Sequence, residues 1–231
     1  MITREASLLA GFRYDQFCPL ARATEILAGR WTLLIVRELL TAPRRFSDLL
    51  RPLPGISTSV LSNRLAHLQG HGLVQRRALP PPAASSVYEL TRAGRELLPS
   101  VIELARWGLR FLGAPGPDDH VDPGWAWIGL VCLARRGPSL ARTVNISVPD
   151  VGYEHRLHVA GGPQGTAVSH EFSDADLSIT APTLVLLGLA SGRLDPEEAV
   201  RSGLLRAEGN LEVLEDFPVL FDIQSADTQG E

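Results

Sequence analysis

Lysine is absent from this sequence of 231 residues, and all 22 of its basic residues are arginines. Because most arginine codons are GC-rich, this bias indicates a GC-rich genome. Cysteine is scarce: Cys18 and Cys132 lie far apart, which excludes a disulfide framework and a cysteine-based metal site. Long hydrophobic runs are also missing, since the apolar stretches near 31–36 and 183–190 are far shorter than the ~20 residues of a membrane helix.

Signatures of catalysis are missing too, most clearly in the second half of the chain. It has no glycine-rich phosphate loop, no Gly-x-Ser-x-Gly motif and no set of His, Cys and Asp with metal-ligand spacing. His155 and His158 fall in an expected strand, where a spacing of three points them to opposite faces. We therefore predict no catalytic residue, metal site or cofactor, and no enzymatic activity. Residues 1–12 do not resemble a signal peptide, which favours a cytoplasmic protein with no membrane association.

The charge of the chain is divided sharply between its two halves. Residues 1–113 hold 15 arginines against 8 acidic residues, whereas residues 114–231 hold 7 arginines against 18 acidic residues. The first half therefore suits a polyanion, and the second half would repel one. The Pro- and Gly-rich stretch 114–124 has the composition of a linker. The predicted organisation is a first domain over 1–113, a linker over 114–124, a second domain over 125–223 and a frayed tail over 224–231.

Helical periodicity and capping signals predict the order of elements in the first half. Cys18 stands at an N-cap position with Pro19 at the first helical position, and Ser57 is the predicted N-cap of the third main helix. Thr91 caps a long last helix. The predicted elements are helices over 18–28, 30–40, 46–50, 57–70 and 91–112, with strands over 73–79 and 87–90 that form a hairpin.

This order is the winged-helix arrangement, whose recognition helix lies in the major groove with its N-terminal residues against base edges. Small polar side chains on the helix after Ser57 permit close approach. Asn63 can pair with adenine, and Arg64 can pair with guanine or a phosphate, so we expect alanine at either position to weaken binding. The candidate DNA-binding residues are Arg44, Arg45, Ser57, Thr58, Ser59, Ser62, Asn63, Arg64, His67, Arg76 and Arg77.

The same half resembles the HxlR group of bacterial winged-helix regulators. The resemblance implies a homodimer, with the helices that flank the winged helix at the interface, and binding to palindromic operators in double-stranded DNA. The wing tip 80–86 departs from the pattern, because it lacks a basic residue that could read the minor groove. The matching segments are Cys-Pro-Leu-Ala-Arg-Ala (18–23), Gly-Arg-Trp-Thr-Leu-Leu-Ile-Val-Arg-Glu-Leu-Leu (29–40), Pro-Arg-Arg-Phe-Ser-Asp-Leu (43–49), Pro-Gly-Ile-Ser-Thr-Ser-Val-Leu-Ser-Asn-Arg-Leu (54–65), Gly-Leu-Val (72–74) and Tyr-Glu-Leu-Thr-Arg-Ala-Gly (88–94).

Cys18 has two interpretations. A thiol at a helix N-terminus can have a lowered pKa and react with oxidants, and several regulators that resemble this group sense oxidants or electrophiles at this Cys-Pro position. The alternative is a small side chain that packs at the start of a helix. The absence of a second cysteine nearby favours the second interpretation, while Cys132 falls on an apolar helix and is expected to be inert core.

The second half resembles a sterol-carrier-protein-type domain over roughly 125–222. Its predicted elements are helices over 125–135, 183–191, 196–202 and 211–221, with strands over 143–148, 154–159, 166–172, 175–181 and 204–208. The resemblance implies a sheet covered by helices around an apolar cavity. The candidate lining residues, each of which could instead be ordinary core, are Trp125, Trp127, Leu130, Val131, Ile146, Val148, Phe172, Leu184, Leu187 and Phe221.

The expected fold class is α+β, with an N-terminal winged helix-turn-helix and a C-terminal sheet covered by helices. We expect a dimeric DNA-binding regulator whose second domain binds an apolar small molecule. One alternative is a thiol-based regulator acting through Cys18, with the second domain serving assembly. Another is an enzyme or lipid carrier that has acquired a DNA-binding head, and the missing catalytic motifs count against that enzyme.

Overall fold

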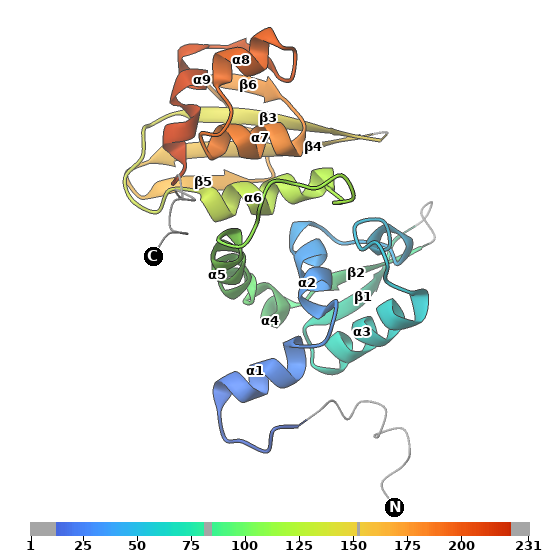
Figure 1. The fold of residues 1–231 in the computed structure, drawn as a ribbon. Helices are drawn as coiled ribbons and strands as arrows, with labels where there is room; N and C mark the ends of the chain where they lie inside the picture. The colour runs from blue at the N-terminus through green and yellow to red at the C-terminus, as the bar shows by residue number, and fades with distance from the viewer. Residues whose placement is uncertain (1–12, 81–84, 152, 223–231) are drawn as a thin grey trace, which may run out of the picture. The chain divides into compact units, whose positions relative to one another are not determined.

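The computed structural model describes residues 13–80, 85–151 and 153–222. The predicted frayed tail and most of the proline-rich wing tip lie outside these residues, as does segment 1–12. The chain forms two compact units, which divide between Val101 and Ile102 (Figure 1). No helix of the described residues is both long enough and apolar enough to cross a membrane.

The N-terminal unit has the predicted winged helix-turn-helix. Strands β1 and β2 pair in antiparallel register, and a bridge between Arg44 and Tyr88 ties the end of helix α2 to the hairpin. The unit contains α1 (Pro19–Leu27), α2 (Thr32–Thr41), the 3-10 helix η1 (Ser47–Leu49), α3 (Thr58–Gly70), β1 (Val74–Ala78), β2 (Ser86–Leu90), α4 (Arg92–Arg95) and the start of α5 (Leu98–Leu109).

The core of this unit is formed where α2, α3 and the hairpin meet. The Ser57 hydroxyl accepts a hydrogen bond from the backbone N–H of Val60 and so caps α3, as predicted. Gly94 packs so closely under the hairpin that a Cβ there would collide with the carbonyl of Leu73. The buried apolar residues of the core are Ile35, Val36, Leu39, Leu49, Leu53, Leu61, Leu65, Leu68, Val74 and Leu90.

Two predicted helices of the first half differ in the structure. The helix expected over 30–40 begins later, at Thr32, because Trp31 has a left-handed backbone with φ of 76°. The long helix expected over 91–112 is divided into α4 and α5. Pro99 lies in the first turn of α5 and has no N–H to donate to the preceding turn, so the helix restarts there.

The C-terminal unit is a five-stranded mixed sheet with helices, as predicted. The strand order is β5-β4-β3-β6-β7, in which β3 and β6 are parallel and the other neighbours antiparallel. After the 3-10 helix η2 (Pro123–Trp125) and α6 (Ala126–Leu133), its elements are β3 (Thr143–Asp150), β4 (Tyr153–Gly162), β5 (Gly165–Ser169), β6 (Leu177–Thr180), α7 (Thr183–Ala190), α8 (Pro196–Arg201), β7 (Arg206–Gly209), α9 (Glu212–Asp216) and η3 (Phe217–Leu220).

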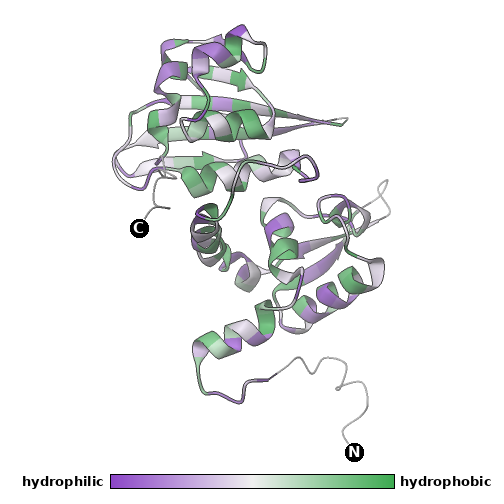
Figure 2. Ribbon diagram, viewed as in Figure 1, coloured by the Kyte–Doolittle hydropathy of each residue, from purple (hydrophilic) through white to green (hydrophobic). Residues whose placement is uncertain are grey.

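One face of this sheet is apolar and covered by helices. Val144, Ile146 and Val148 alternate along β3 and are fully buried, as are Leu157 and Val159 on β4. Figure 2 shows hydrophobic residues along α7 and the adjoining part of α6, which lie over this face. The helix expected over 211–221 is instead α9 followed by η3, because Pro218 cannot continue the α-helical hydrogen bonding.

Helix α5 contributes to both units. Val101 in its first turn packs against the winged-helix core, as does Leu97 just before the helix. Within the C-terminal unit, the Arg106 guanidinium donates hydrogen bonds to the carbonyls of Val131, Cys132 and Ala134 at the end of α6, over 3.0, 2.8 and 3.2 Å. Carbonyl groups in the last turn of a helix have no N–H partner within that helix. Arg106 supplies donors to these groups and so caps the C-terminal end of α6.

Candidate nucleic-acid interface and the C-terminal module

The N-terminal half of α3 presents a small polar surface. Leu61, Leu65 and Leu68 bury one side of the helix in the core, which leaves the opposite side to solvent. Of the residues predicted to face DNA, this exposed side carries Ser57, Thr58, Ser59, Ser62 and Asn63. Ala66 and Gln69 continue it one and two turns further along. Neither residue is among the predicted DNA contacts, although helical spacing from Ser62 and Asn63 places both on this side.

Two predicted DNA contacts on α3 lie elsewhere. The Arg64 side chain packs over Gly29, and its Nε donates to the carbonyl of Arg30 over 3.1 Å. The Nε2 atom of His67 lies 3.0 Å from the carbonyl oxygen of Ile26, where it can donate. Both side chains therefore hold the turn between α1 and α2 against α3. A contact of either residue with DNA stays a prediction.

The predicted phosphate-binding arginines differ in their freedom. Arg45 is exposed before η1, and Arg76 is exposed on β1 with its Nε donating to Ser86 Oγ over 2.7 Å. Arg77 is paired with Glu89 over 2.9 Å. Hydrogen bonds from Gln75 and Arg77 lower the pKa of Glu89, so its carboxylate stays charged and offsets Arg77. Arg44 is half-buried and donates to Thr41 Oγ1 over 3.3 Å. Arg45 and Arg76 are the better placed to meet phosphates.

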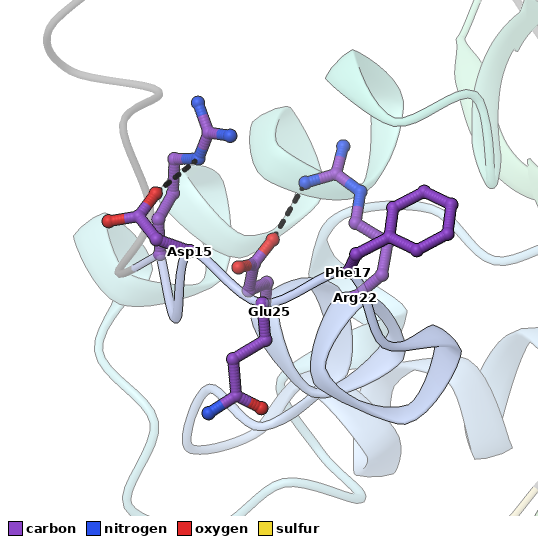
Figure 3. Close-up of a pocket in the computed structure, with 6 residues that line it drawn as sticks. Asp15, Phe17, Arg22 and Glu25 are labelled. Atoms are coloured by element: carbon purple, nitrogen blue, oxygen red, sulfur yellow. Dashed lines mark hydrogen bonds and ion pairs between the residues drawn. The ribbon is translucent and has the colours of Figure 1, made fainter.

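An open hollow of about 490 Å³ precedes α1 (Figure 3). Its charges are paired with one another: Arg22 contacts Glu25 over 2.9 Å, and Arg13 contacts Asp15 over 3.7 Å. The backbone N–H of Tyr14 also donates to Glu25. The six residues that line it are Arg13, Asp15, Gln16, Phe17, Arg22 and Glu25. Its lining is mostly charged and polar, so the hollow is a poor receptor for an apolar ligand.

The two cysteines have opposite environments. Cys18 is exposed at the N-cap of α1, and its side chain makes no capping hydrogen bond. Cys132 is buried in α6, and burial raises the pKa of its thiol to about 11.

The folded protein therefore binds the proton of the Cys132 thiol more tightly than the unfolded chain. The free energy of unfolding should fall as the pH rises from about 9 towards 11.

We expect one fast and one slow thiol in the native protein. Cys18 should react quickly with Ellman's reagent at neutral pH, because the thiolate is the attacking form and this thiol is accessible. Cys132 should react only after unfolding in guanidinium. The Cys18→Ser variant should lose the fast phase and keep the slow one. Two fast thiols in the wild-type protein would contradict the burial of Cys132.

The candidate lining residues of the C-terminal module do not all meet. Trp127, Leu130, Ile146, Val148 and Phe221 are buried in its core. Trp125, Val131 and Leu187 are partly buried, and Leu184 is exposed on α7. Phe172 is exposed and lies under the guanidinium of Arg156, on the sheet face opposite the core. Gly129 lets α6 and α7 pack closely, since a Cβ there would press on Leu187. Among the described residues, no group of three or more His, Cys, Asp and Glu could hold a metal ion.

Comparisons with known proteins agree with this two-part organisation. Residues 26–115 match the HxlR-like helix-turn-helix family, and residues 134–222 match the SCP-2 sterol transfer family. An uncharacterized HTH-type transcriptional regulator of Synechocystis is 36% identical over 101 residues, which are 44% of this chain and 75% of that protein.

A second relative extends further along the chain. An uncharacterized HTH-type transcriptional regulator of Mycobacterium tuberculosis is 39% identical over 146 residues, which are 59% of this chain and 88% of that protein. Among solved structures, the reduced form of the regulator YodB from Bacillus subtilis is 30% identical and covers 44% of this chain and 100% of that one, with a TM-score of 0.38. Both predicted resemblances are thus confirmed, and the chain belongs to the HxlR-like helix-turn-helix family of DNA-binding transcriptional regulators, with an SCP-2 domain at its C-terminal end.

Proposed function

We propose that this regulator binds a palindromic operator as a homodimer in the cytoplasm, and that an apolar or amphipathic molecule in the SCP-2 domain changes its affinity for DNA. The observation that carries the proposal is the union, in one chain, of a helix-turn-helix domain with a domain of the sterol transfer family. The second domain has a net charge of the wrong sign for DNA, which leaves it free for another role.

Two helices of the C-terminal unit support an apolar ligand. Helix α6 (AWIGLVCL) and helix α7 (TLVLLGLA) contain no charged residue. Leu184 nevertheless remains exposed on α7, and Val131 and Leu187 are only partly buried. A helix that is apolar on every side belongs in a core or against an apolar partner. We infer that an apolar molecule packs against these two helices.

An exposed stripe on α5 supports the dimer. Leu104, Trp107 and Phe111 are 49%, 57% and 68% exposed, and the rings of Trp107 and Phe111 lie 4.8 Å apart. Leu104 and Trp107 lie about one turn apart on α5, and Phe111 lies in the turn that follows its last residue, Leu109. Large exposed apolar groups of this kind mark interaction surfaces. A two-fold partner here would present two copies of α3 to half-sites ~10 bp apart or a multiple of that distance.

The anchoring of α5 supplies a route for ligand control. Arg106 caps the C-terminus of α6, and Glu103 pairs with Arg136 just beyond it. The same helix carries Val101 into the core of the DNA-binding unit, next to Leu97, which immediately precedes the helix. A molecule that shifts α6 would therefore act on a helix shared with the DNA-binding unit. Such a ligand changes DNA affinity only by its differential affinity for the two states of the protein.

A panel of medium-chain alcohols, fatty acids and sterols should contain a molecule that changes operator affinity of the full chain, by about 1–3 kcal/mol if the coupling is typical. The operator would first be selected from random-sequence DNA, and affinity followed by fluorescence anisotropy. Arg106→Gln should bind the molecule but lose most of this response, because the cap on α6 is gone. Arg110→Gln is the matched control, since that side chain is exposed and forms no hydrogen bond or ion pair with another described residue. A panel without any effective member would count against ligand control.

A second function is favoured by the exposure of Cys18 at the start of α1. In that case, oxidation of Cys18 rather than a ligand would release the DNA. Cys132 is too deeply buried to act as its partner thiol. Treatment with diamide separates the two functions: release of the wild-type protein but not of Cys18→Ser would favour the thiol sensor.

A further inference from the structure

Two histidines, a buried carboxylate and two aromatic rings meet at one end of the helix-covered face of the C-terminal sheet. We call Trp127, Asp150, Tyr153, His155 and His170 the histidine cluster. They come from α6, the ends of β3 and β4, and the residue after β5. The cluster therefore depends on the strand pairing of the whole sheet.

Strand geometry places both histidines on the apolar face. His155 alternates with the buried residues Leu157 and Val159 along β4, so all three point to the same side. His158 pairs with Ser169 in the register of β4 and β5. His170, one residue further, therefore lies beside Leu157 and on the same side as His155. His158 points the other way and contacts Asn145 at 2.9 Å, as the sequence spacing predicts.

The cluster is held in place by a few specific contacts. The Nε2 atom of His155 lies 3.3 Å from Asp150 Oδ2, and the Asp150 side chain is only 4% exposed. The Trp127 indole N–H donates to the carbonyl of Val168 over 3.2 Å, which fixes the ring. That ring lies 4.9 Å from the His170 imidazole. The histidines are thus presented at the end of an apolar surface.

The histidines keep free hydrogen-bonding capacity at this place. No hydrogen bond to either ring nitrogen of His170 is formed among the described residues, and His155 uses only one of its two nitrogens. His170 is exposed to solvent. Two neighbouring imidazoles with unused nitrogens can donate hydrogen bonds to the anionic group of an amphipathic molecule, while its apolar tail packs against the nearby helices.

We propose that His155 and His170 bind the carboxylate of an amphipathic ligand, whose apolar chain packs against Trp127 and the adjoining apolar surface of α6. This proposal rests on the proposed ligand-binding function of the C-terminal module and names the class of its ligand. Asp150 lies within hydrogen-bonding distance of His155 and orients its ring, while the charge of the bound carboxylate favours the protonated form of His170. Binding therefore takes up protons.

The charges that face the histidines set the direction of the pH dependence. His170 is faced by Trp127 from α6 and by His155 from β4, and His155 is faced by Asp150 from β3 and by Tyr153 on its own strand. Partial desolvation, and secondly the charge of His155, lower the pKa of His170, which favours its neutral form. A bound carboxylate raises the pKa of His170 again. Affinity should then increase as the pH falls through the range in which His170 titrates.

The test compares laurate with dodecanol, which has the same chain length but no carboxylate, using the full-length protein and concentrations below micelle formation. Calorimetry between about pH 8 and about pH 6, where histidine titrates and laurate stays ionised, should show laurate binding strengthened by about tenfold for each unit of pKa change. Dodecanol binding should not depend on pH. Buffers of different ionisation enthalpy should show proton uptake with laurate alone.

Matched variants assign the effect to the cluster. His155→Gln and His170→Gln should each reduce laurate binding while leaving dodecanol binding unchanged, and His170→Gln should also reduce its pH dependence. His158→Gln, on the opposite face of the same strand, should behave as the wild type. Equal pH dependence in all three variants, or no laurate binding at about pH 6, would overturn the proposal. If laurate binds as described without changing operator affinity, the site stands and ligand control of DNA binding fails.

Discussion

Replacing Asn63 with alanine is expected to weaken operator binding by about 1–3 kcal/mol per half-site contact, the range measured for amide side chains that pair with adenine. Asn63 lies on the exposed side of α3. Leu61 and Leu65 on the opposite side are buried in the core, which keeps Asn63 facing solvent. The substitution removes no hydrogen bond of the described structure. The loss should therefore appear in DNA affinity, measured by fluorescence anisotropy at fixed salt, with the melting temperature unchanged.

Gln69→Ala is the control for this experiment. Gln69 lies on the same exposed side of α3 but near its C-terminus, where a recognition helix leaves the base edges. Its replacement should change affinity much less than that of Asn63. Equal, small effects of both substitutions would mean that the N-terminal half of α3 does not read bases.

Placing glutamate at both Trp107 and Phe111 is expected to separate the dimer. Two negative charges would then lie on each copy of the apolar stripe of α5, where like charges and lost apolar burial both oppose association. Linked binding of two half-sites exceeds single-site binding by about 10²–10⁴-fold, so operator affinity should fall within that range. Multi-angle light scattering should report a monomer for this variant and a dimer for the wild type.

The control adds the same charge elsewhere. Ser169 and Ser178 are exposed, and they lie on the face of the C-terminal sheet opposite the helices. A Ser169→Glu, Ser178→Glu variant should remain dimeric and keep its operator affinity. A wild-type protein that is monomeric both alone and on DNA would contradict the dimer outright.

The sequence predicts the order of elements well, because periodicity and caps are local signals. Ser57 caps α3 as expected, and alternating valines and isoleucines mark β3. Contacts between distant segments are not visible in such patterns. The inward position of Arg64 depends on the turn at Arg30, 34 residues away. The break before α5, by contrast, could have been predicted from Pro99.

The histidine cluster shows the same limit. Sequence spacing correctly separates His155 from His158, but it cannot bring His155 to His170, because that needs the register between β4 and β5. Likewise, Phe172 is apolar and follows strand β5, which would suggest a place in the core. Its ring instead packs under Arg156 on the opposite face of the sheet. Burial on a sheet depends on which face the neighbouring strands present, and this is a property of the folded domain.

Selection of binding sites from random-sequence DNA, carried out in parallel for the wild type and Asn63→Ala, tests the central claim most directly. The wild-type protein should select a two-fold symmetric site with an adenine preference in each half, since the proposed dimer presents two copies of α3 and Asn63 is proposed to pair with adenine. The variant should select the same symmetric site but lose that single preference in both halves. An identical site for both proteins, or a site without two-fold symmetry, would contradict the account.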